Sequence, residues 1–289
     1  MADTVEMQDI RGLDIDKAVK GFALVEYTFK NDCTVSSMSG DAVRWYSETA
    51  ADLTATAPSV VANISPLSGF PTLEVSWTRN TSYVKKFAAE GFLSMEDIKS
   101  ADIDVLARTL LRLTRAVTKQ VDATIYNVLT ENDTPTNINT VATNAPWNTS
   151  GYTSVNAVED ILDAKKSIQD YNYDTSNCVL YLTPLGYKSL LTWLIDGKGS
   201  SIPQFSSDRV KDGTMLELLG VKIKVSPNVT ADKAVMFIPQ KACTWKSFQD
   251  ITSRVIEEPG IGSKIRVWEL GIPILTDPRA VCLITNIDA

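Results

Sequence analysis

The sequence of 289 residues contains no histidine. Histidine is the side chain that most often exchanges protons near neutral pH, and its ring nitrogens are common zinc ligands. Its absence excludes Ser-His-Asp and Cys-His nucleophile systems and every zinc site built on imidazole. Carboxylate, lysine and metal–carboxylate chemistry remain open. The composition therefore favours a binding or structural protein over an enzyme.

Cysteine is scarce and widely spaced. The four cysteines are Cys33, Cys178, Cys243 and Cys282, and no two of them form a Cys-x-x-Cys pair. Without such a pair the sequence offers no thiolate zinc site. Cys178 and Cys282 lie in apolar runs, where an unpaired cysteine is typically a small core residue. This pattern is typical of a reducing compartment.

Long hydrophobic runs and nucleotide-binding motifs are also missing. The longest charge-free stretches, Leu53–Leu73 and Thr134–Val158, are rich in Ser, Thr, Asn and Pro, so neither predicts a membrane span. The sequence has no Gly-x-Gly-x-x-Gly, and Gly-Lys-Gly-Ser-Ser at 197–201 lacks the upstream glycine of a phosphate loop. Adjacent acids, as at 96–97 or 257–258, point in different directions and predict no metal or catalytic site. We expect no cofactor and no membrane partner.

What is present is an ordinary globular composition. Hydrophobic residues make up 44% of the chain and charged residues 22%, which excludes a disordered protein. The net charge of −7 disfavours wrapping of nucleic acid over the whole surface. The length fits one large domain or two modest ones.

Hydrophobic periodicity predicts an α+β architecture with two layers and protruding segments. The strongest element is a helix at 102–131, whose apolar residues recur every three or four positions. Weaker patterns predict helices at 154–170 and 184–196, and strands at 22–29, 73–77, 177–183, 219–226, 233–239, 252–258, 264–270 and 279–287. The Pro-Gly-Ile-Gly sequence at 259–262 predicts a turn that joins two of these strands in a hairpin.

Polar segments separate these elements. Residues 1–20 are acidic and predict a solvated arm. The long polar segment between the strands at 22–29 and 73–77 has no core of its own, so we expect it either to be functional or to rest on something else. Loops are predicted at 132–154 and 197–213, because Gly, Ser, Asn and Thr are frequent there.

A row of basic residues lies opposite the apolar face of the predicted long helix: Arg108, Arg112, Arg115 and Lys119. The simplest interpretation is a solvated helix face. The alternative is a surface that faces an acidic neighbouring subunit or a polyanion.

Three segments resemble the major capsid proteins of tailed bacteriophages. Residues 90–129 (EGFLSMEDIKSADIDVLARTLLRLTRAVTKQVDATIYNVL) resemble the segment that leads into the spine helix of that family. Residues 218–229 (LLGVKIKVSPNV) are similar to a recurrent sequence motif of its central domain. Residues 269–287 (ELGIPILTDPRAVCLITNI) are similar to the segment that ends in its closing strand. The segments occur in the family's order, and the resemblance that they mark out, from residue 90 to residue 287, spans most of the chain.

The resemblance implies a phage major capsid fold. Its parts would be an N-terminal arm at 1–35, an extended β-hairpin loop at 40–80, a peripheral domain on the spine helix at 81–132 and 250–275, and an α/β axial domain at 133–249 and 276–289. It implies a non-enzymatic shell protein that forms hexamers and pentamers and builds an icosahedral head around double-stranded DNA. Assembly would occur in the host cytoplasm, and the mature location would be the virion. An encapsulin-type nanocompartment shell around a cargo enzyme shares this fold and is the alternative.

The resemblance also implies partners and contact residues. The partners would be further copies of the chain, a separate scaffold, a portal, decoration proteins, and double-stranded DNA contacted without sequence specificity. Four charged residues of the loop at 197–213 would surround the capsomer axis: Lys198, Asp208, Arg209 and Lys211.

Some members of the family join a lysine of the extended loop covalently to an asparagine of a neighbour. This sequence has no lysine between Lys30 and Lys85, which lie on segments predicted as strands at the flanks of the loop. The loop bases are Arg44 and Arg79, which stay protonated and cannot act as nucleophiles. We therefore expect a non-covalent shell.

Overall fold

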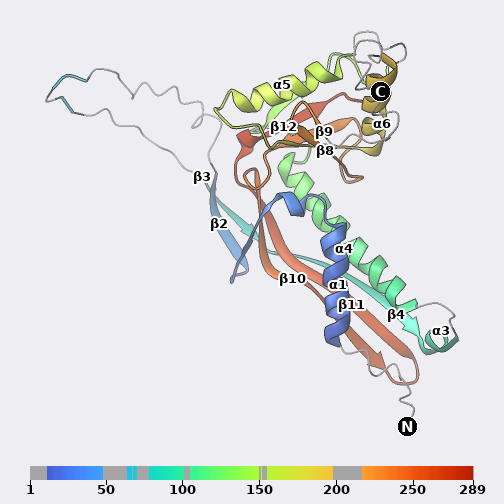
Figure 1. The fold of residues 1–289 in the computed structure, drawn as a ribbon. Helices are drawn as coiled ribbons and strands as arrows, with labels where there is room; N and C mark the ends of the chain where they lie inside the picture. Colours follow the sequence, from blue (N-terminus) through green and yellow to red (C-terminus); the bar gives the residue numbers. More distant parts are fainter. Residues whose placement is uncertain are drawn as a thin grey trace. The chain divides into compact units, whose positions relative to one another are not determined.

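The structure is a computed structural model that describes residues 12–47, 64–66, 68–69, 78–100, 105–149, 151, 155–197 and 217–288. It has the mixed helix and strand content that the periodicity predicts (Figure 1). The chain forms two compact units: unit 1 comprises 1–43, 82–126 and 244–274, and unit 2 comprises 44–81, 127–243 and 275–289. The peripheral and axial domains inferred from the resemblance stay predictions.

Unit 1 is built on a four-stranded sheet with the strand order β1-β10-β11-β4. The strands are β1 (Thr34–Ser37), β10 (Cys243–Glu258), β11 (Gly262–Leu275) and β4 (Lys85–Ser94). β1 runs parallel to β10, and β11 runs antiparallel to β4. The predicted hairpin at 259–262 is confirmed, and Gly260 in its turn has a φ of 77°, which glycine adopts at little cost. The strands predicted at 252–258 and 264–270 are parts of this longer hairpin.

Helix α4 (Val105–Leu129) packs on one face of this sheet. The predicted helix is confirmed from residue 105 onward, whereas residues 101–104 lie outside the described residues. Its buried side chains include Leu110, Val117 and Val121, which follow the predicted apolar face. Gly91 of β4 allows the close approach, because a Cβ there would lie 3.1 Å from Thr109. A short helix α3 (Met95–Ser100) follows β4.

Helix α1 (Gly12–Glu26) occupies the place of the strand predicted at 22–29 and of much of the solvated arm predicted at 1–20. Both predictions are wrong over these residues. Val19, Ala23 and Tyr27 are buried at intervals of four residues, which is a helical spacing. The sequence prediction missed this spacing because it placed a boundary between two segments at residue 21. A 3₁₀ turn, η2 (Lys30–Asp32), follows before β1, so Lys30 does not lie on a strand as predicted.

Unit 2 contains a six-stranded mixed sheet with the order β5-β12-β9-β6-β8-β7. The strands are β5 (Asn139–Ala142), β12 (Val281–Thr285), β9 (Lys233–Phe237), β6 (Val179–Leu182), β8 (Val221–Val225) and β7 (Glu217–Leu218). The four predicted strands of this region are confirmed as β6, β8, β9 and β12. The loop predicted at 132–154 is wrong over Asn139–Ala142, which pair with β12 as β5, and β7 was not predicted.

Two predicted helices of unit 2 are also confirmed. α5 (Ala157–Gln169) packs on β5 and β12, and α6 (Pro184–Thr192) packs on β6 before a single π-helical turn at Trp193–Gly197. The hydroxyl of Thr183 accepts a hydrogen bond from the N–H of Gly186 and caps α6, which begins at the predicted Pro184. The core between helices and sheet includes Trp147, Trp193 and Leu180.

A separate two-stranded sheet joins β2 (Ala42–Ser47) to β3 (Thr78–Tyr83). These strands flank most of the segment predicted as an extended loop at 40–80. The strand predicted at 73–77 lies outside the described residues.

Candidate assembly surfaces

The chemistry available in the described residues is limited. None of them form a group of three or more Cys, Asp or Glu side chains that could hold a metal ion. All four cysteines are buried and none forms a disulfide, and burial was predicted for Cys178 and Cys282. Burial raises the pKa of the Cys178 thiol to about 11 and that of Cys282 to about 12, so both are protonated and unreactive at neutral pH. Within the described part of the chain, no helix is long and apolar enough to cross a membrane.

The four predicted basic residues of α4 are exposed and form one row: Arg108, Arg112, Arg115 and Lys119. Nε of Arg115 donates to Oε1 of Glu26 on α1 at 2.7 Å, which joins the two helices side by side. The single acidic residue of α4, Asp122, is buried and lies away from this row. The exposed charges of α4 are therefore all positive.

Asp122 fastens the segment after α1 to α4. Its carboxylate accepts from the N–H of Thr28 at 2.7 Å, the hydroxyl of Thr28 at 2.9 Å and the N–H of Lys30 at 3.1 Å. Burial raises the pKa of Asp122, and these hydrogen bonds oppose the rise. The carboxylate holds backbone groups that would otherwise be buried without partners.

A buried ion pair fastens the same segment to the sheet. Nζ of Lys30 lies 2.5 Å from Oε1 of Glu269 on β11, and the two side chains are 11% and 0% exposed. The hydroxyl of Tyr27 donates to the other carboxylate oxygen. The Lys30 ammonium lies 4.3 Å from the ring centre of Tyr27 and 5.4 Å from that of Trp245. Burial and the charge of Glu269 raise the pKa of Tyr27, so its hydroxyl stays a donor.

Sequence reasoning missed this pair, although the sequence carries a signal for it. In β11 the alternation places Glu269 on the same face as Ile265 and Val267, which are buried. A carboxylate on an apolar strand face is costly without a partner, so the pattern indicates a buried cation supplied from elsewhere.

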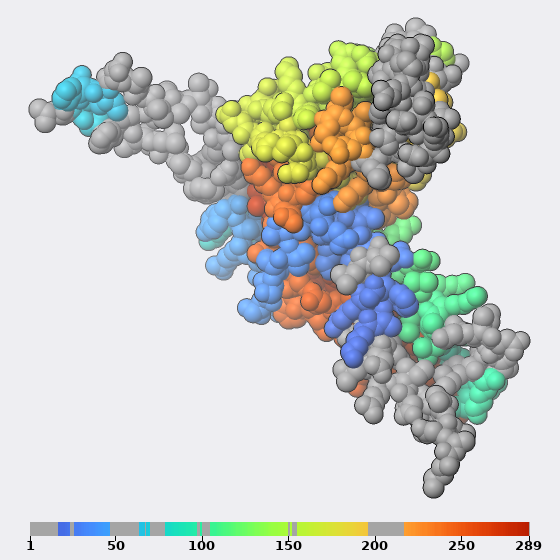
Figure 2. Space-filling view, in the orientation of Figure 1, coloured from blue at the N-terminus to red at the C-terminus, as the bar shows by residue number. Residues whose placement is uncertain are grey.

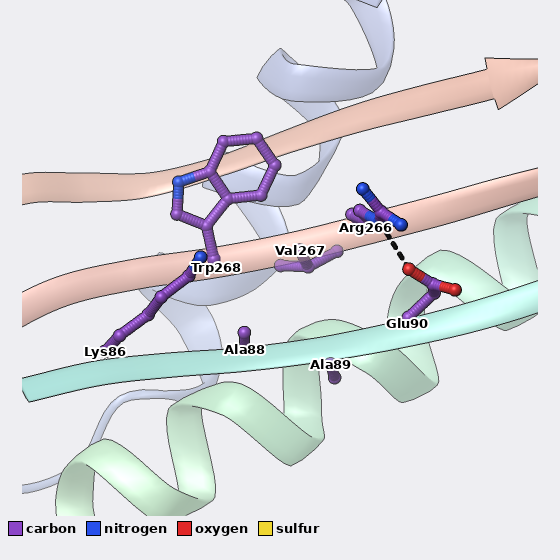
Figure 3. A pocket seen from close by; sticks show the side chains of 7 residues that line it. All are labelled: Lys86, Ala88, Ala89, Glu90, Arg266, Val267 and Trp268. Atoms are coloured by element: carbon purple, nitrogen blue, oxygen red, sulfur yellow. Dashed lines mark hydrogen bonds and ion pairs between the residues drawn. The ribbon is translucent and has the colours of Figure 1, made fainter.

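The sheet of unit 1 has a second face, away from α4, that carries exposed side chains. A shallow hollow of about 270 Å³ runs along β4 and β11 (Figure 3). Lys86 and Trp268 lie toward one end, and an ion pair between Arg266 and Glu90 lies toward the other. Phe92, next to Glu90 on the same face of β4 by register, is 49% exposed. Exposed aromatic side chains among mixed charges are typical of a protein contact surface.

The four predicted residues near the capsomer axis, Lys198, Asp208, Arg209 and Lys211, lie outside the described residues. Their role stays a prediction. The described residues thus form two candidate contact surfaces, which are the basic row of α4 and the exposed face of the unit 1 sheet.

Comparisons with known proteins identify a matching family and solved structures with a similar fold. A family model described as phage capsid protein matches residues 79–284. Curated protein sequences give no match. Among solved structures, the capsid of a native GTA particle has a TM-score of 0.66 at 14% identity, with 91% of this chain and 97% of that chain covered. The capsid of the cyanophage P-SCSP1u has a TM-score of 0.65 at 13% identity, with 91% and 89% covered. A virus-like particle from Pyrococcus furiosus has a TM-score of 0.63 at 12% identity, with 94% and 98% covered.

At these identities the solved structures show a shared fold, and it is the mixed capsid fold that the sequence resemblance implied. The family match rests on the sequence itself and spans more than half of the chain. The chain therefore belongs to the phage capsid protein family, whose members are major capsid proteins of the icosahedral shell of bacteriophage virions.

Proposed function

We propose that this chain is a major capsid protein that self-assembles through hexamers and pentamers into an icosahedral head enclosing double-stranded DNA. The observation that carries the proposal is the family match over 79–284, supported by a capsid fold that covers most of the chain. Pentamers and hexamers need heterologous contacts that close by symmetry, and the exposed sheet face of unit 1 suits one side of such a contact. The role is structural and involves no catalysis.

In this proposal α4 is the spine helix of the peripheral domain, and the sheet of unit 2 belongs to the axial domain. The arm at 1–35 and the extended loop at 40–80 lie over neighbouring subunits. The loop residues Lys198, Asp208, Arg209 and Lys211 surround the capsomer axis, where exposed charge pairs contribute a fraction of about 1 kcal/mol each. A scaffold, a portal and decoration proteins are separate chains, and assembly takes place in the host cytoplasm.

Electron microscopy of the purified protein tests the proposal. The chain is expressed alone and together with a candidate scaffold protein, and particles are examined by negative stain. We expect hollow shells with five-fold and six-fold capsomers. A protein that stays monomeric with and without scaffold, at every salt concentration tried, would contradict the proposal.

A second candidate function is an encapsulin-type shell that encloses a cargo enzyme. The likeness to a virus-like particle from Pyrococcus furiosus, 98% of whose chain is covered, favours it. Particle contents separate the two functions. Packaged DNA and a portal indicate a viral head, whereas a co-purifying protein inside DNA-free shells indicates a nanocompartment.

A further inference from the structure

The solvent side of α1 and α4 is a basic surface on an acidic protein. It consists of Arg108, Arg112, Arg115 and Lys119 of α4 together with the exposed Lys17 and Lys20 of α1, and we name this set the basic helical face. α1 lies at the molecular surface in Figure 2. The chain as a whole carries a net charge of −7, and α1 carries Asp14, Asp16 and Glu26 besides its two lysines. The local departure therefore lies on α4, whose exposed charges are all positive.

The spacing along α4 suits a linear polyanion. The steps from Arg108 to Arg112, Arg115 and Lys119 are four, three and four residues, which keeps all four side chains on one side of the helix. The row covers about 17 Å of helix axis. Duplex DNA carries about ten phosphate charges over the same length.

The apolar pattern argues against a protein partner on this side. No large hydrophobic side chain of α4 is exposed, and none is exposed among residues 17–23 and 26 of α1, the part of that helix whose side chains the structure describes. Stable protein interfaces depend on buried aromatic or aliphatic anchors. In unit 1 such exposed side chains lie on strands and in the turn between β10 and β11, with Phe92 49%, Phe248 40% and Ile261 58% exposed. A row of cations without anchors is what sequence-independent phosphate binding requires.

Glu26 reduces the charge of this surface. It pairs with Arg115 at 2.7 Å and so neutralises one of the four cations of α4. Asp122 does not act in this way, since its carboxylate is buried and occupied by Thr28 and Lys30.

We propose that the basic helical face is the surface that contacts packaged double-stranded DNA, and that Glu26 limits its strength by holding Arg115. The assignment rests on the proposed shell function, which it extends by naming the DNA-facing side of unit 1. The binding is sequence-independent and depends strongly on salt.

The first test measures binding of the purified full-length chain to a labelled random-sequence DNA duplex over a series of potassium chloride concentrations. Each phosphate neutralised by a cation contributes about −0.9 to the slope of log affinity against log salt. The triple variant Arg108→Gln, Arg112→Gln, Lys119→Gln should therefore reduce the magnitude of this negative slope by about 2.7. Arg115→Gln should change the slope little, whereas Glu26→Gln should increase its magnitude by about 0.9, because Arg115 is released.

The matched control removes the same charge elsewhere in the protein. Lys86→Gln, Lys222→Gln and Arg254→Gln change three exposed cations on other elements. The slope of this variant should stay at the wild-type value. Equal losses in both triple variants, or an unchanged slope in Glu26→Gln, would overturn the assignment.

Particles distinguish this proposal from the shell function itself. If the wild type forms shells and the first triple variant forms shells with less DNA, both ideas hold. If the triple variant fails to assemble while its DNA slope is unchanged, the face binds a protein such as an acidic scaffold, and the DNA assignment is wrong. If the wild type forms no shell, the shell function fails, and the slopes still decide whether the face binds DNA.

Discussion

Lys30 and Glu269 form an ion pair that water scarcely reaches. Removing one partner leaves an uncompensated buried charge, so Lys30→Met should lower the free energy of unfolding by about 3–5 kcal/mol. The double variant Lys30→Met, Glu269→Leu removes both charges and should recover most of this loss. Urea unfolding of the unassembled chain measures each value.

The exposed pair Arg266–Glu90 on the same sheet supplies the control. Its side chains are 52% and 44% exposed, so Arg266→Gln should cost at most about 1 kcal/mol. A Lys30→Met variant as mild as this control would show that the buried pair does not fix the segment after α1.

Glu131 holds a strained turn after α4. Glu131, Asn132 and Asp133 have φ values of 51°, 57° and 60°. Asparagine and aspartate tolerate this left-handed region because their short side chains form local hydrogen bonds, whereas the longer glutamate side chain lacks this compensation. Burial raises the pKa of the Glu131 carboxyl, but hydrogen bonds from the backbone and side chains of Thr136 and Asn137 together outweigh it. The pKa therefore lies below its ordinary value of 4.5.

The lowered pKa of Glu131 has a defined sign for stability. The ionised carboxylate stabilises the fold above its unfolded-state pKa, and this contribution is lost as the pH falls through the folded-state pKa. The difference in unfolding free energy between wild type and Glu131→Gln should be largest near neutral pH and shrink below pH 4.5. Denaturant unfolding at several pH values measures it, and a difference that does not vary with pH would contradict the account.

At the scale of elements, two glycines of unit 1 should respond in opposite ways to alanine. A Cβ at Gly271 of β11 would lie 2.4 Å from the Trp245 ring and 2.9 Å from the carbonyl of Lys246, whereas one at Gly21 of α1 meets nothing within 4 Å. Gly271→Ala should cost about 1–3 kcal/mol through overpacking. Gly21→Ala should stabilise by about 0.5–1 kcal/mol, because glycine is a poor helix residue. Thermal unfolding compares them, and equal effects would show that sheet and helix do not pack as described.

The loop at 197–213 offers a second test at this scale. If its charged residues surround the capsomer axis, deletion of 199–207 should impair assembly and leave folding intact. Circular dichroism of the unassembled variant checks the fold, and microscopy checks assembly. Normal shells from the deletion variant would place the loop away from subunit contacts.

The elements also show what the sequence could and could not reveal. α4 was predictable because apolar residues of its buried face recur without interruption. β4 was missed because its inward positions include Ala89 and Gly91, which give a weak hydrophobic signal. They are small because α4 lies close over them, and this contact joins segments that no local window contains.

The basic row was predictable for the same reason as α4, since an exposed helix face follows from the position of the buried one. The buried carboxylates were not, because their partners are 92 to 242 residues away in the sequence. Only the folded chain brings Tyr27 and Lys30 to Asp122 and Glu269.

At the scale of the whole molecule, the shell should contain no covalent links between chains. The chain has no lysine between Lys30 and Lys85. Lys30 is held in its ion pair, and Lys85 is the first residue of β4. Boiled and reduced particles should give one band near 31.7 kDa on a denaturing gel. A ladder of pentamers and hexamers that survives reduction would show that another lysine reacts.

The strand orders of both sheets bear on when during synthesis the protein can fold. β10 and β11 supply the two middle strands of unit 1, and β12 lies between β5 and β9 in unit 2. Ribosomes add about 5–20 residues per second from the N-terminus, so α1 and α4 are made well before the strands that cover them. A chain interrupted before residue 243 has neither sheet in complete form. An interrupted copy therefore lacks central strands of both sheets and is left to chaperones and proteases.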